Sequence, residues 1–253
     1  WVAIAFFWGA FLIARRTRKY LYNKNLYSTT LRYYWVYKLV RKALFMKRIK
    51  IDYTENNVKL VPSTACVFVC NHKSNSDPLA IFVLLYQVMQ ATGKKHYWIF
   101  IAKKELNKKF GIVTHVLSLI DALFLDRDNI RQQIRVLEKE NEFIRAKRSI
   151  VVFPEGHRYP EEQFGEFKAG ALKPAYDCYV PISPVVIFNS SGLFDSNKKF
   201  VNKKDRTIYL KVLPALKPVN FHSLNMQYCT EKLQADMQKE YSKMKAAYEK
   251  SAK

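Results

Sequence analysis

The sequence has few cysteines, and their positions exclude a disulfide framework. Four cysteines stand at irregular intervals among 253 residues, unlike the regular spacings of small disulfide-linked secreted domains. Cys66 and Cys70 fall in one apolar run, where the extended chain holds them too far apart to bond to each other. We therefore expect a reducing compartment. With His72 they do not form a zinc site either, because a buried strand does not wrap two thiolates around one ion, and we expect no metal.

Acidic residues are also scarce. The chain has 43 Lys and Arg against 21 Asp and Glu, a formal net charge of +22. Such an excess of positive charge indicates an anionic partner: a nucleic acid, a phospholipid surface, an acidic protein or a phosphorylated substrate. Composition alone does not choose among them. The length of 253 residues suits one α/β domain with a sizeable core and a smaller appendage.

The apolar run that opens the chain is short for a membrane span. Residues 1–14 carry no charge, yet as a helix they extend only about 21 Å, whereas a hydrocarbon core is about 30 Å thick. A basic cluster, Arg15–Lys19, follows at once, the reverse of the order in a cleaved signal peptide. The chain begins at Trp1 and not at Met, so we expect residues upstream of it. The run is then either the end of a spanning helix with a cytoplasmic basic flank or a segment that dips into one leaflet.

The next segment, Leu26–Lys50, is crowded with aromatic and basic side chains. Leu31 and Trp35 lie four residues apart, a helical spacing. Tyr and Trp prefer the lipid headgroup region, and Lys and Arg extend toward lipid phosphates. We therefore expect a membrane-embedding helical hairpin over residues 1–50 and an α/β domain over residues 51–253. The rival interpretation is a nucleic-acid surface of stacking aromatics among cations. The adjacent uncharged run favours the membrane, and we expect no nucleic-acid partner.

A strand, a polar loop and a helix are predicted between Cys66 and Leu85. Cys66–Cys70 is a short apolar run typical of a strand buried on both faces. Asp77 followed by Pro78 is a common helix start. His72 lies just past the strand, and Asp77 opens the helix, at the edge where open α/β sheets bind ligands.

The spacing of His72 and Asp77 suggests a general base and the carboxylate that orients it. A loop at this junction lets the carboxylate bond one imidazole nitrogen, which fixes the tautomer and stabilises the imidazolium. In the alternative interpretation Asp77 only caps the helix and His72 is a solvated loop residue. Both interpretations hold together if one carboxylate oxygen caps the helix and the other bonds the imidazole.

Further strands and helices complete the predicted fold. Apolar runs predict strands near residues 49–59, 97–102, 122–125, 149–153, 179–189 and 206–212. The strand over residues 179–189 contains Pro181 and Pro184, so we expect it at an edge or with a bulge. Ile130, Ile134 and Ile144 trace one face of a crossover helix, and residues 221–247 form a last helix. The fold class is α/β: a mixed, largely parallel β-sheet flanked by helices.

Charged residues stand directly after two other predicted strands, as His72 stands after the strand at residues 66–70. Arg127 comes after the strand at residues 122–125, where a guanidinium grips phosphate with two hydrogen bonds. Glu155, Gly156 and Arg158 follow the next strand; the glycine permits a sharp turn that brings backbone amides to an anion. Glu155 accepts from glycerol hydroxyls in this interpretation, and Arg158 holds phosphate. In the alternative, Glu155 and Arg158 form a surface ion pair.

The loop string NHKSNSD, residues 71–77, resembles the NHxxxxD signature of the glycerolipid acyltransferases, notably the 1-acylglycerol-3-phosphate (lysophosphatidic acid) acyltransferases. Three further strings follow in the family's order: ALFLDR (Ala122–Arg127), FPEGHR (Phe153–Arg158) and VPISPVVI (Val180–Ile187). The resemblance implies transfer of a fatty acyl group from a thioester to the 2-hydroxyl of lysophosphatidic acid, giving phosphatidic acid. His72 then removes the hydroxyl proton, and Asp77 orients His72.

The resemblance also implies further site residues and partners. One of Lys103 and Lys104, in the string AKKEL, helps to hold the acceptor phosphate; in the alternative, both are solvated. The last string lines the acyl-chain side, through Val180, Pro181, Ile182 and Val185. No cofactor is implied: the thioester comes from acyl carrier protein or coenzyme A, between which the sequence does not choose. The implied location is the cytoplasmic face of a membrane, in a bacterium the inner membrane, with monotopic or single-pass attachment.

Several positions depart from the family's strings. The family's EGTRS reads EGHRY here, with His157 for Thr and Tyr159 for Ser, which indicates a shifted acceptor preference. Asp121 stands where the family has Gly, and Asn107 follows AKKEL without the family's Pro. Two alternatives therefore stay open. One is an acyltransferase that acts on glycerol-3-phosphate or another lysophospholipid, and the other is a non-catalytic basic membrane- or nucleic-acid-binding protein.

Overall fold

A seven-stranded mixed sheet forms the centre of the molecule. The computed structural model describes residues 2–53, 59–107, 111–193 and 205–251; part of the predicted strand at 49–59 lies outside these ranges. The strand order is β1 (Lys50–Tyr53), β7 (Thr207–Val212), β6 (Ile182–Phe188), β2 (Val67–Cys70), β5 (Ser149–Val152), β3 (Trp98–Lys103) and β4 (Leu123–Leu125). From β6 to β4 all neighbours are parallel, whereas β7 is antiparallel to β6 and parallel to β1. The predicted fold class is confirmed.

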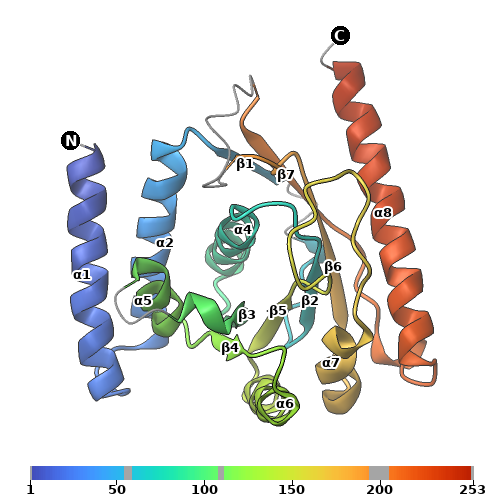
Figure 1. Ribbon diagram of the computed structural model, residues 1–253, viewed down its shortest axis with the longest axis horizontal. Helices are drawn as coiled ribbons and strands as arrows, with labels where there is room; N and C mark the ends of the chain where they lie inside the picture. The colour runs from blue at the N-terminus through green and yellow to red at the C-terminus, as the bar shows by residue number, and fades with distance from the viewer. Residues whose placement is uncertain (1, 54–58, 108–110, 194–204, 252–253) are drawn as a thin grey trace.

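Helices cover both faces of the sheet, and each face has its own hydrophobic core (Figure 1). One face carries α1 (Val2–Tyr22), α2 (Thr29–Met46), α4 (Asp77–Thr92) and α5 (Ile112–Leu119). The other carries α6 (Ile130–Arg145), α7 (Lys173–Cys178) and α8 (Met226–Ser251). Short 3₁₀ turns complete the chain at η1 (Lys104–Leu106), η2 (Ala169–Leu172) and η3 (Pro218–Asn220). Two-faced cover explains why the inner strands are continuous apolar runs.

The central strand β2 has neighbours on both sides and is buried throughout. Val67 and Val69 belong to the core under α8, whereas Phe68 and Cys70 belong to the core under α4. This alternation follows from the two-residue period of a strand. Helix α4 begins at Asp77 and ends before Gly93. The φ of Gly93 is 65°, a left-handed conformation that glycine adopts easily because it has no Cβ.

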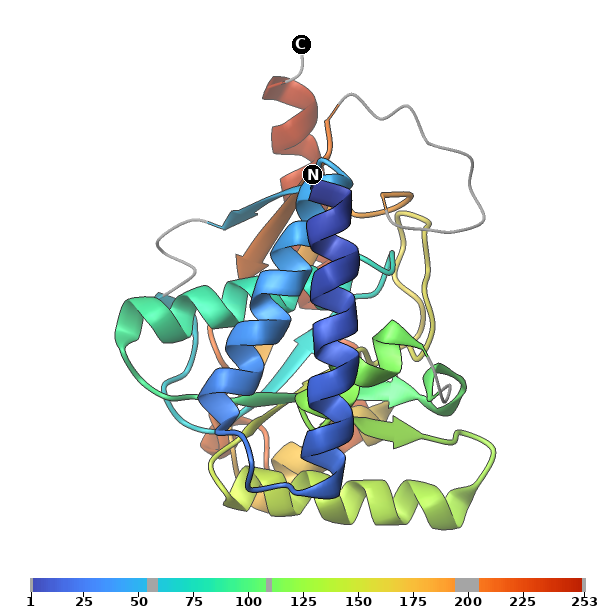
Figure 2. The same cartoon turned by 90° about the vertical axis from the view of Figure 1, so that its left-hand side faces the viewer.

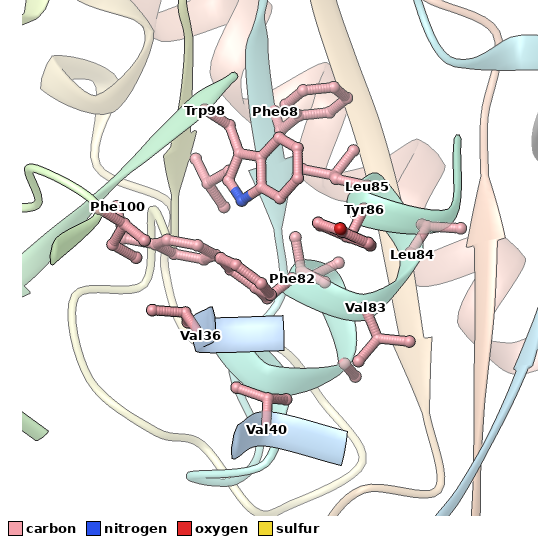
Figure 3. Close-up of a cluster of buried hydrophobic side chains, with 14 of the residues drawn as sticks. Val36, Val40, Phe68, Phe82, Val83, Leu84, Leu85, Tyr86, Trp98 and Phe100 are labelled. Atoms are coloured by element: carbon pink, nitrogen blue, oxygen red, sulfur yellow. The ribbon is translucent and has the colours of Figure 1, made fainter. Parts of the chain in front are cut away.

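Phe82 of α4 lies at the centre of the first core (Figure 3). Its ring meets Trp98 edge-on with centroids 5.3 Å apart and stacks on Tyr33 of α2 at 5.8 Å. Val36 and Val40 of α2 approach the same cluster from the outer side. Each such buried side chain stabilises the fold by about 1.5–3 kcal/mol, so α2 is part of the domain core.

Helices α1 and α2 lie side by side over one end of the sheet (Figure 2), and α1 is two-sided. Phe6, Ala10, Ile13, Thr17 and Tyr20 of α1 are buried or half-buried, at the helical spacing of an inward face. The opposite face leaves four large apolar side chains exposed, by 67 %, 69 %, 63 % and 58 %: Ile4, Phe7, Trp8 and Phe11. Among the described residues no helix is both long and apolar enough to cross a bilayer. The first hydrophobic core contains side chains from both sides of residue 50, so α1 and α2 pack against the α/β domain. The predicted membrane contact stays a prediction.

A buried ion network joins these helices to the sheet. Asp121 accepts a hydrogen bond of 2.5 Å from the Tyr20 hydroxyl, and its carboxylate lies 3.0 Å from Arg32 and 3.1 Å from Arg148. Its φ is 57°, in the left-handed region that favours glycine. This backbone conformation explains why a glycine fits here in related strings, and the carboxylate gives Arg32 and Arg148 a partner.

Two sequence predictions about elements are wrong. Strand β6 is not an edge strand: it lies between β2 and β7, and all seven of its residues are buried. The predicted irregularity is present, because Val185 pairs with Val212 whereas Ile182 pairs with Leu216, which leaves one extra residue on the opposite chain. In α6 the predicted inward residues Ile130 and Ile134 are 74 % and 52 % exposed. The predicted Ile144 is buried, together with Val136 and Glu140, because the helix contacts the sheet and α7 along that stripe.

Candidate active site

The predicted functional residues gather at one edge of the sheet. Strands β2, β5, β3 and β4 are adjacent and parallel, so the loops after them leave at the same edge. His72 follows β2, residues 155–158 follow β5, Lys103 ends β3 and Arg127 follows β4. The strand order therefore places the imidazole at one end of a row and the basic side chains beyond it.

The predicted contact between His72 and Asp77 is present. His72 Nδ1 lies 3.0 Å from Asp77 Oδ2, and the carboxylate is fully buried. The same oxygen accepts from the backbone amides of Lys73 at 2.6 Å and Ser74 at 2.7 Å. The carboxylate thus closes its own loop and does not cap the helix. Donation from Nδ1–H to Asp77 leaves Nε2 unprotonated, the tautomer that a general base needs.

Three more contacts fix His72. Its backbone N–H donates to Glu155 Oε1 at 2.6 Å, and its carbonyl accepts from the Tyr159 amide at 2.8 Å. Its ring lies over Phe153 with centroids 4.5 Å apart. The side chain is 17 % exposed, which is enough for Nε2 to meet a hydroxyl group. Asn71, one residue earlier, extends the β2–β6 ladder with side-chain bonds to both backbone groups of Ile187, at 2.9 and 2.8 Å.

Glu155 has a different position from the one the sequence predicted. It is 1 % exposed, and its second oxygen accepts from the Gly165 amide at 2.9 Å. Burial raises the pKa of this carboxyl, while the amides of His72 and Gly165 act in the opposite direction. The predicted bond to a glycerol hydroxyl and the alternative surface ion pair are both wrong, because the carboxylate is enclosed. Glu155 instead positions the backbone of His72.

Lys73 is a buried cation beside the imidazole. Its ammonium group donates to the carbonyls of Glu161, Glu162 and Gln163, the last two at 3.3 and 2.9 Å. It also lies 5.1 Å from the ring centre of Tyr241 in α8. Burial lowers the pKa of Lys73, and nearby carboxylates oppose that shift. Lys73 therefore ties the loop over the site to the His72 loop and to α8.

The basic side chains meet around Gly156. The φ of Gly156 is 77°, and a Cβ on it would lie 3.4 Å from Nη1 of Arg127. Lys103 and Arg127 are both near enough to His157 to lower the pKa of that imidazole. Lys104, in contrast, pairs with Asp126 at 2.8 Å. Of the two predicted lysines, Lys103 is therefore the one whose charge acts on His157, whereas Lys104 has a carboxylate partner.

Arg158 is exposed at this edge, directly after Gly156 and His157. The predicted set for the phosphate is thus Lys103, Arg127, Gly156 and Arg158, brought together by the ends of β3, β4 and β5.

Three of the four predicted acyl-chain residues lie away from the site. Val67 at the start of β2 pairs with Ile182, and its amide donates to Pro181, so Val180, Pro181 and Ile182 lie at the opposite edge of the sheet. Five residues of strand between Val67 and His72 correspond to roughly 17 Å. Ile182 and Val185 are fully buried in two different cores. Val185, in contrast, pairs with Cys70 at the end of β2 that leads to His72, so an acyl-chain contact of Val185 stays a prediction.

Some residues at the site were not predicted from the sequence. Lys168 lies near His157, and Phe153 supports the His72 ring. The string FKAGA at residues 167–171 marks the place of Lys168 but gives it no role. The described residues contain no group of three or more His, Cys, Asp or Glu side chains arranged to hold a metal ion.

Comparison with known proteins identifies the family. The family model described as "Acyltransferase" matches residues 49–188, more than half of the chain. The chain belongs to the acyltransferase family. A relative named "Probable 1-acyl-sn-glycerol-3-phosphate acyltransferase" from Mycoplasma pneumoniae is 35% identical over 221 residues, which cover 85% of this chain and 80% of the relative. A protein of the same name from Mycoplasma genitalium is 37% identical over 204 residues, covering 79% and 73%.

The fold of this acyltransferase is also found in a solved structure. The 1-acyl-sn-glycerophosphate (LPA) acyltransferase PlsC from Thermotoga maritima aligns with a TM-score of 0.70 and 21% identity, over 97% of this chain and 95% of that one. The match includes the helices before residue 49, which the family model does not reach.

Proposed function

We propose that this acyltransferase moves a fatty acyl group from a thioester to the 2-hydroxyl of 1-acylglycerol-3-phosphate, giving phosphatidic acid. The observation that carries the proposal is the 3.0 Å contact between His72 Nδ1 and the buried Asp77, at the edge where Lys103 and Arg127 gather. The names of the Mycoplasma relatives support the same acceptor.

The reaction needs one proton acceptor and one orienting group. Nε2 of His72 takes the proton of the acceptor hydroxyl as its oxygen attacks the thioester carbonyl. The new C–O bond forms, the C–S bond breaks, and the departing thiolate takes the proton from the imidazolium. Asp77 stabilises the imidazolium through Nδ1–H. General-base catalysis of this kind contributes about 10²–10⁴ in rate, and no acyl-enzyme is required.

The basic side chains bind and orient the acceptor. Lys103, Arg127 and Arg158 neutralise the phosphate. The amide of Gly156 is bonded to the carbonyl of Phe153 at 3.0 Å, so the glycine contributes by leaving room for the guanidinium of Arg127 beside it. Phosphate bound here lies across the β5 and β3 loops, while the glycerol hydroxyl extends toward β2 and His72. The contribution of these residues is mainly orientation of the attacking oxygen.

The exposed face of α1 is the proposed membrane contact. Ile4, Phe7, Trp8 and Phe11 form an apolar stripe, and the Arg15–Lys19 cluster follows on the same helix. Apolar side chains enter the acyl boundary while Arg and Lys meet anionic headgroups. The acceptor is itself a lipid, so a monotopic position on the cytoplasmic face of a membrane, in a bacterium the inner membrane, brings enzyme and acceptor together.

A donor-by-acceptor panel with purified protein tests the proposal. The donors are acyl carrier protein and coenzyme A thioesters, and the acceptors are lysophosphatidic acid, glycerol-3-phosphate and lysophosphatidylglycerol. Release of free thiol and formation of the diacyl product are followed together. Transfer fastest to lysophosphatidic acid supports the proposal and identifies the donor. Transfer only to another acceptor, or thiol release without acylated product, would overturn it.

A further inference from the structure

His157 and Tyr159 form a paired unit beside the phosphate residues. The Tyr159 hydroxyl lies 2.9 Å from His157 Nε2, and the two rings stack with centroids 4.9 Å apart. The ring of Tyr159 packs directly on Gly165, where an added Cβ would lie 2.1 Å from it. The backbone amide of Tyr159 donates to the carbonyl of His72. Tyr159 thus has a fixed position, and it fixes the imidazole of His157.

The charges that act on His157 are all positive. Burial and the charges of Arg127 after β4, Lys168 before η2 and Lys103 at the end of β3 all lower the pKa of His157. Arg158 adds a fourth cation from the same loop, and Glu155 is enclosed behind it. A neutral histidine held among cations is the arrangement expected where the missing counter-charge is an anion that binds there.

The hydrogen bond to Tyr159 survives a change of protonation. When the imidazole is neutral, the phenol donates to Nε2; when it is protonated, Nε2–H donates to the phenol oxygen. Nδ1–H is a donor in both states. His157 therefore presents one donor to the anion site at any pH and gains a full charge on protonation.

We propose that His157, oriented by Tyr159, and Lys168 are headgroup-binding residues that make acceptor binding proton-linked and select a phosphomonoester over a phosphodiester. The inference rests on the proposed function, because it assigns residues to the acceptor side of the same site.

The selectivity follows from charge. A phosphomonoester carries a charge of about −1.5 to −2 near neutral pH, with a second pKa of about 6. Its negative charge offsets the cations around His157, so binding raises the pKa of the imidazole and draws a proton onto it. A phosphodiester carries a single negative charge, so its binding raises the pKa of the His157 imidazole by less. Phosphomonoester binding therefore takes up a proton and weakens as pH rises through the imidazole pKa of the complex.

A direct test follows the histidine ring signals by NMR as pH is varied. The chain has five histidines, and the signals of His157 are assigned by their loss in His157→Gln. We expect glycerol-3-phosphate, a soluble phosphomonoester, to raise the pKa of His157 in the wild-type protein, and Lys168→Gln to weaken that response. An unchanged His157 titration in saturating glycerol-3-phosphate would overturn the inference. This readout does not depend on turnover, so it stays informative even if the proposed acyl transfer is absent.

Kinetics give the second test. The KM for lysophosphatidic acid should rise with pH more steeply in the wild type than in His157→Gln, by up to about tenfold for each pH unit. The difference between the two proteins removes the titration of the phosphate itself. Tyr159→Phe keeps the ring on Gly165 but removes the hydroxyl that orients His157. It should lose part of the pH dependence of KM, with kcat little changed. His222→Gln, an exposed histidine at η3, is the matched control. Identical KM profiles in wild type and His157→Gln, or an effect only on kcat, would contradict the assignment.

Discussion

His72 is held at four points, and only one of them comes from its own loop. Asp77 bonds its ring, whereas Glu155, Tyr159 and Phe153 reach it from the segment after β5. A base in van der Waals contact with fixed neighbours needs little reorganisation during proton transfer, which is the advantage of a preorganised site.

Replacing Asp77 by Asn tests the orienting role. The amide keeps the size of the side chain and an oxygen for the Lys73 and Ser74 amides, but it removes the charge that stabilises the imidazolium. We expect kcat to fall by about 10²–10⁴, the range of general-base catalysis, with KM for the acceptor little changed. Steady-state kinetics measure this. A variant with wild-type kcat would show that Asp77 serves only to close the loop.

Replacing Glu155 by Gln tests the positioning role. The amide group offers one acceptor in place of two, so it turns an N–H toward the amide of either His72 or Gly165. An unsatisfied buried donor costs about 1–3 kcal/mol, and we expect a free energy of unfolding lower by that amount. We also expect a lower kcat, because His72 shifts. Chemical denaturation and kinetics on the same sample measure both. Loss of acceptor affinity alone, with stability unchanged, would indicate direct contact with glycerol.

At the level of elements, the docking of α1 and α2 depends on Asp121. Burial disfavours the charged carboxylate, but the Tyr20 hydroxyl and the charges of Arg32 and Arg148 outweigh it, so the pKa of Asp121 is lowered. A lowered pKa means that the folded state holds this proton less tightly than the unfolded state. The stabilisation by the Asp121 carboxylate is therefore complete at pH values above the pKa of Asp in the unfolded chain. It is lost as pH falls through the lower pKa of Asp121 in the folded protein.

The variant Asp121→Asn should reduce the loss of folding stability that the wild type shows as pH falls. It leaves the buried Arg32 and the half-buried Arg148 without this charged partner, so we expect a stability loss of about 3 kcal/mol at neutral pH, at the low end for a broken buried ion pair. The difference from wild type should shrink as pH falls below about 4, where Asp is protonated in the unfolded chain. Denaturant unfolding at several pH values measures this. A difference that stays constant down to pH 2 would show that the carboxylate charge does not stabilise the helices.

The elements differ in how well their sequence predicted them. The junction from β2 to α4 is local: a buried apolar run, an Asp and a Pro define it, and the structure confirms both the helix start and the histidine–carboxylate contact. The place of β6 is not local. Its neighbour β2 precedes it by more than 100 residues, so the prolines suggested an edge strand, whereas the sheet places β6 between β2 and β7.

At the level of the molecule, the sheet order decides which predicted residues meet. Arg127, Lys103 and the 155–158 loop meet His72 because β4, β3 and β5 lie beside β2 in that order. Sequence spacing carries no information on this order, although the motif strings marked each strand end correctly. Val180, Pro181 and Ile182 lie away from the site for the same reason, since the first residues of β6 lie at the opposite edge of the sheet. Lys168 was missed because its loop returns to the site only in three dimensions.

The apolar stripe of α1 predicts how the whole enzyme meets a membrane. Burial of a large apolar side chain contributes about 1.5–3 kcal/mol, so Phe7→Ser with Trp8→Ser should lower binding to anionic phospholipid vesicles by at least about 100-fold. Vesicle sedimentation measures the binding. Tyr228→Ser, an exposed aromatic residue on α8 at the other side of the molecule, is the matched control and should bind like the wild type. Equal binding by the double variant would exclude α1 as the contact.

The replacement of His72 by Ala tests the central claim most directly. Thiol release and phosphatidic acid formation are measured with saturating thioester and lysophosphatidic acid, on a variant shown by circular dichroism to be folded and by sedimentation to bind vesicles. We expect acyl transfer to fall by about 10² or more, to the level left by binding and orientation alone. Full activity in the folded, membrane-bound variant would contradict the assignment of His72 as the general base.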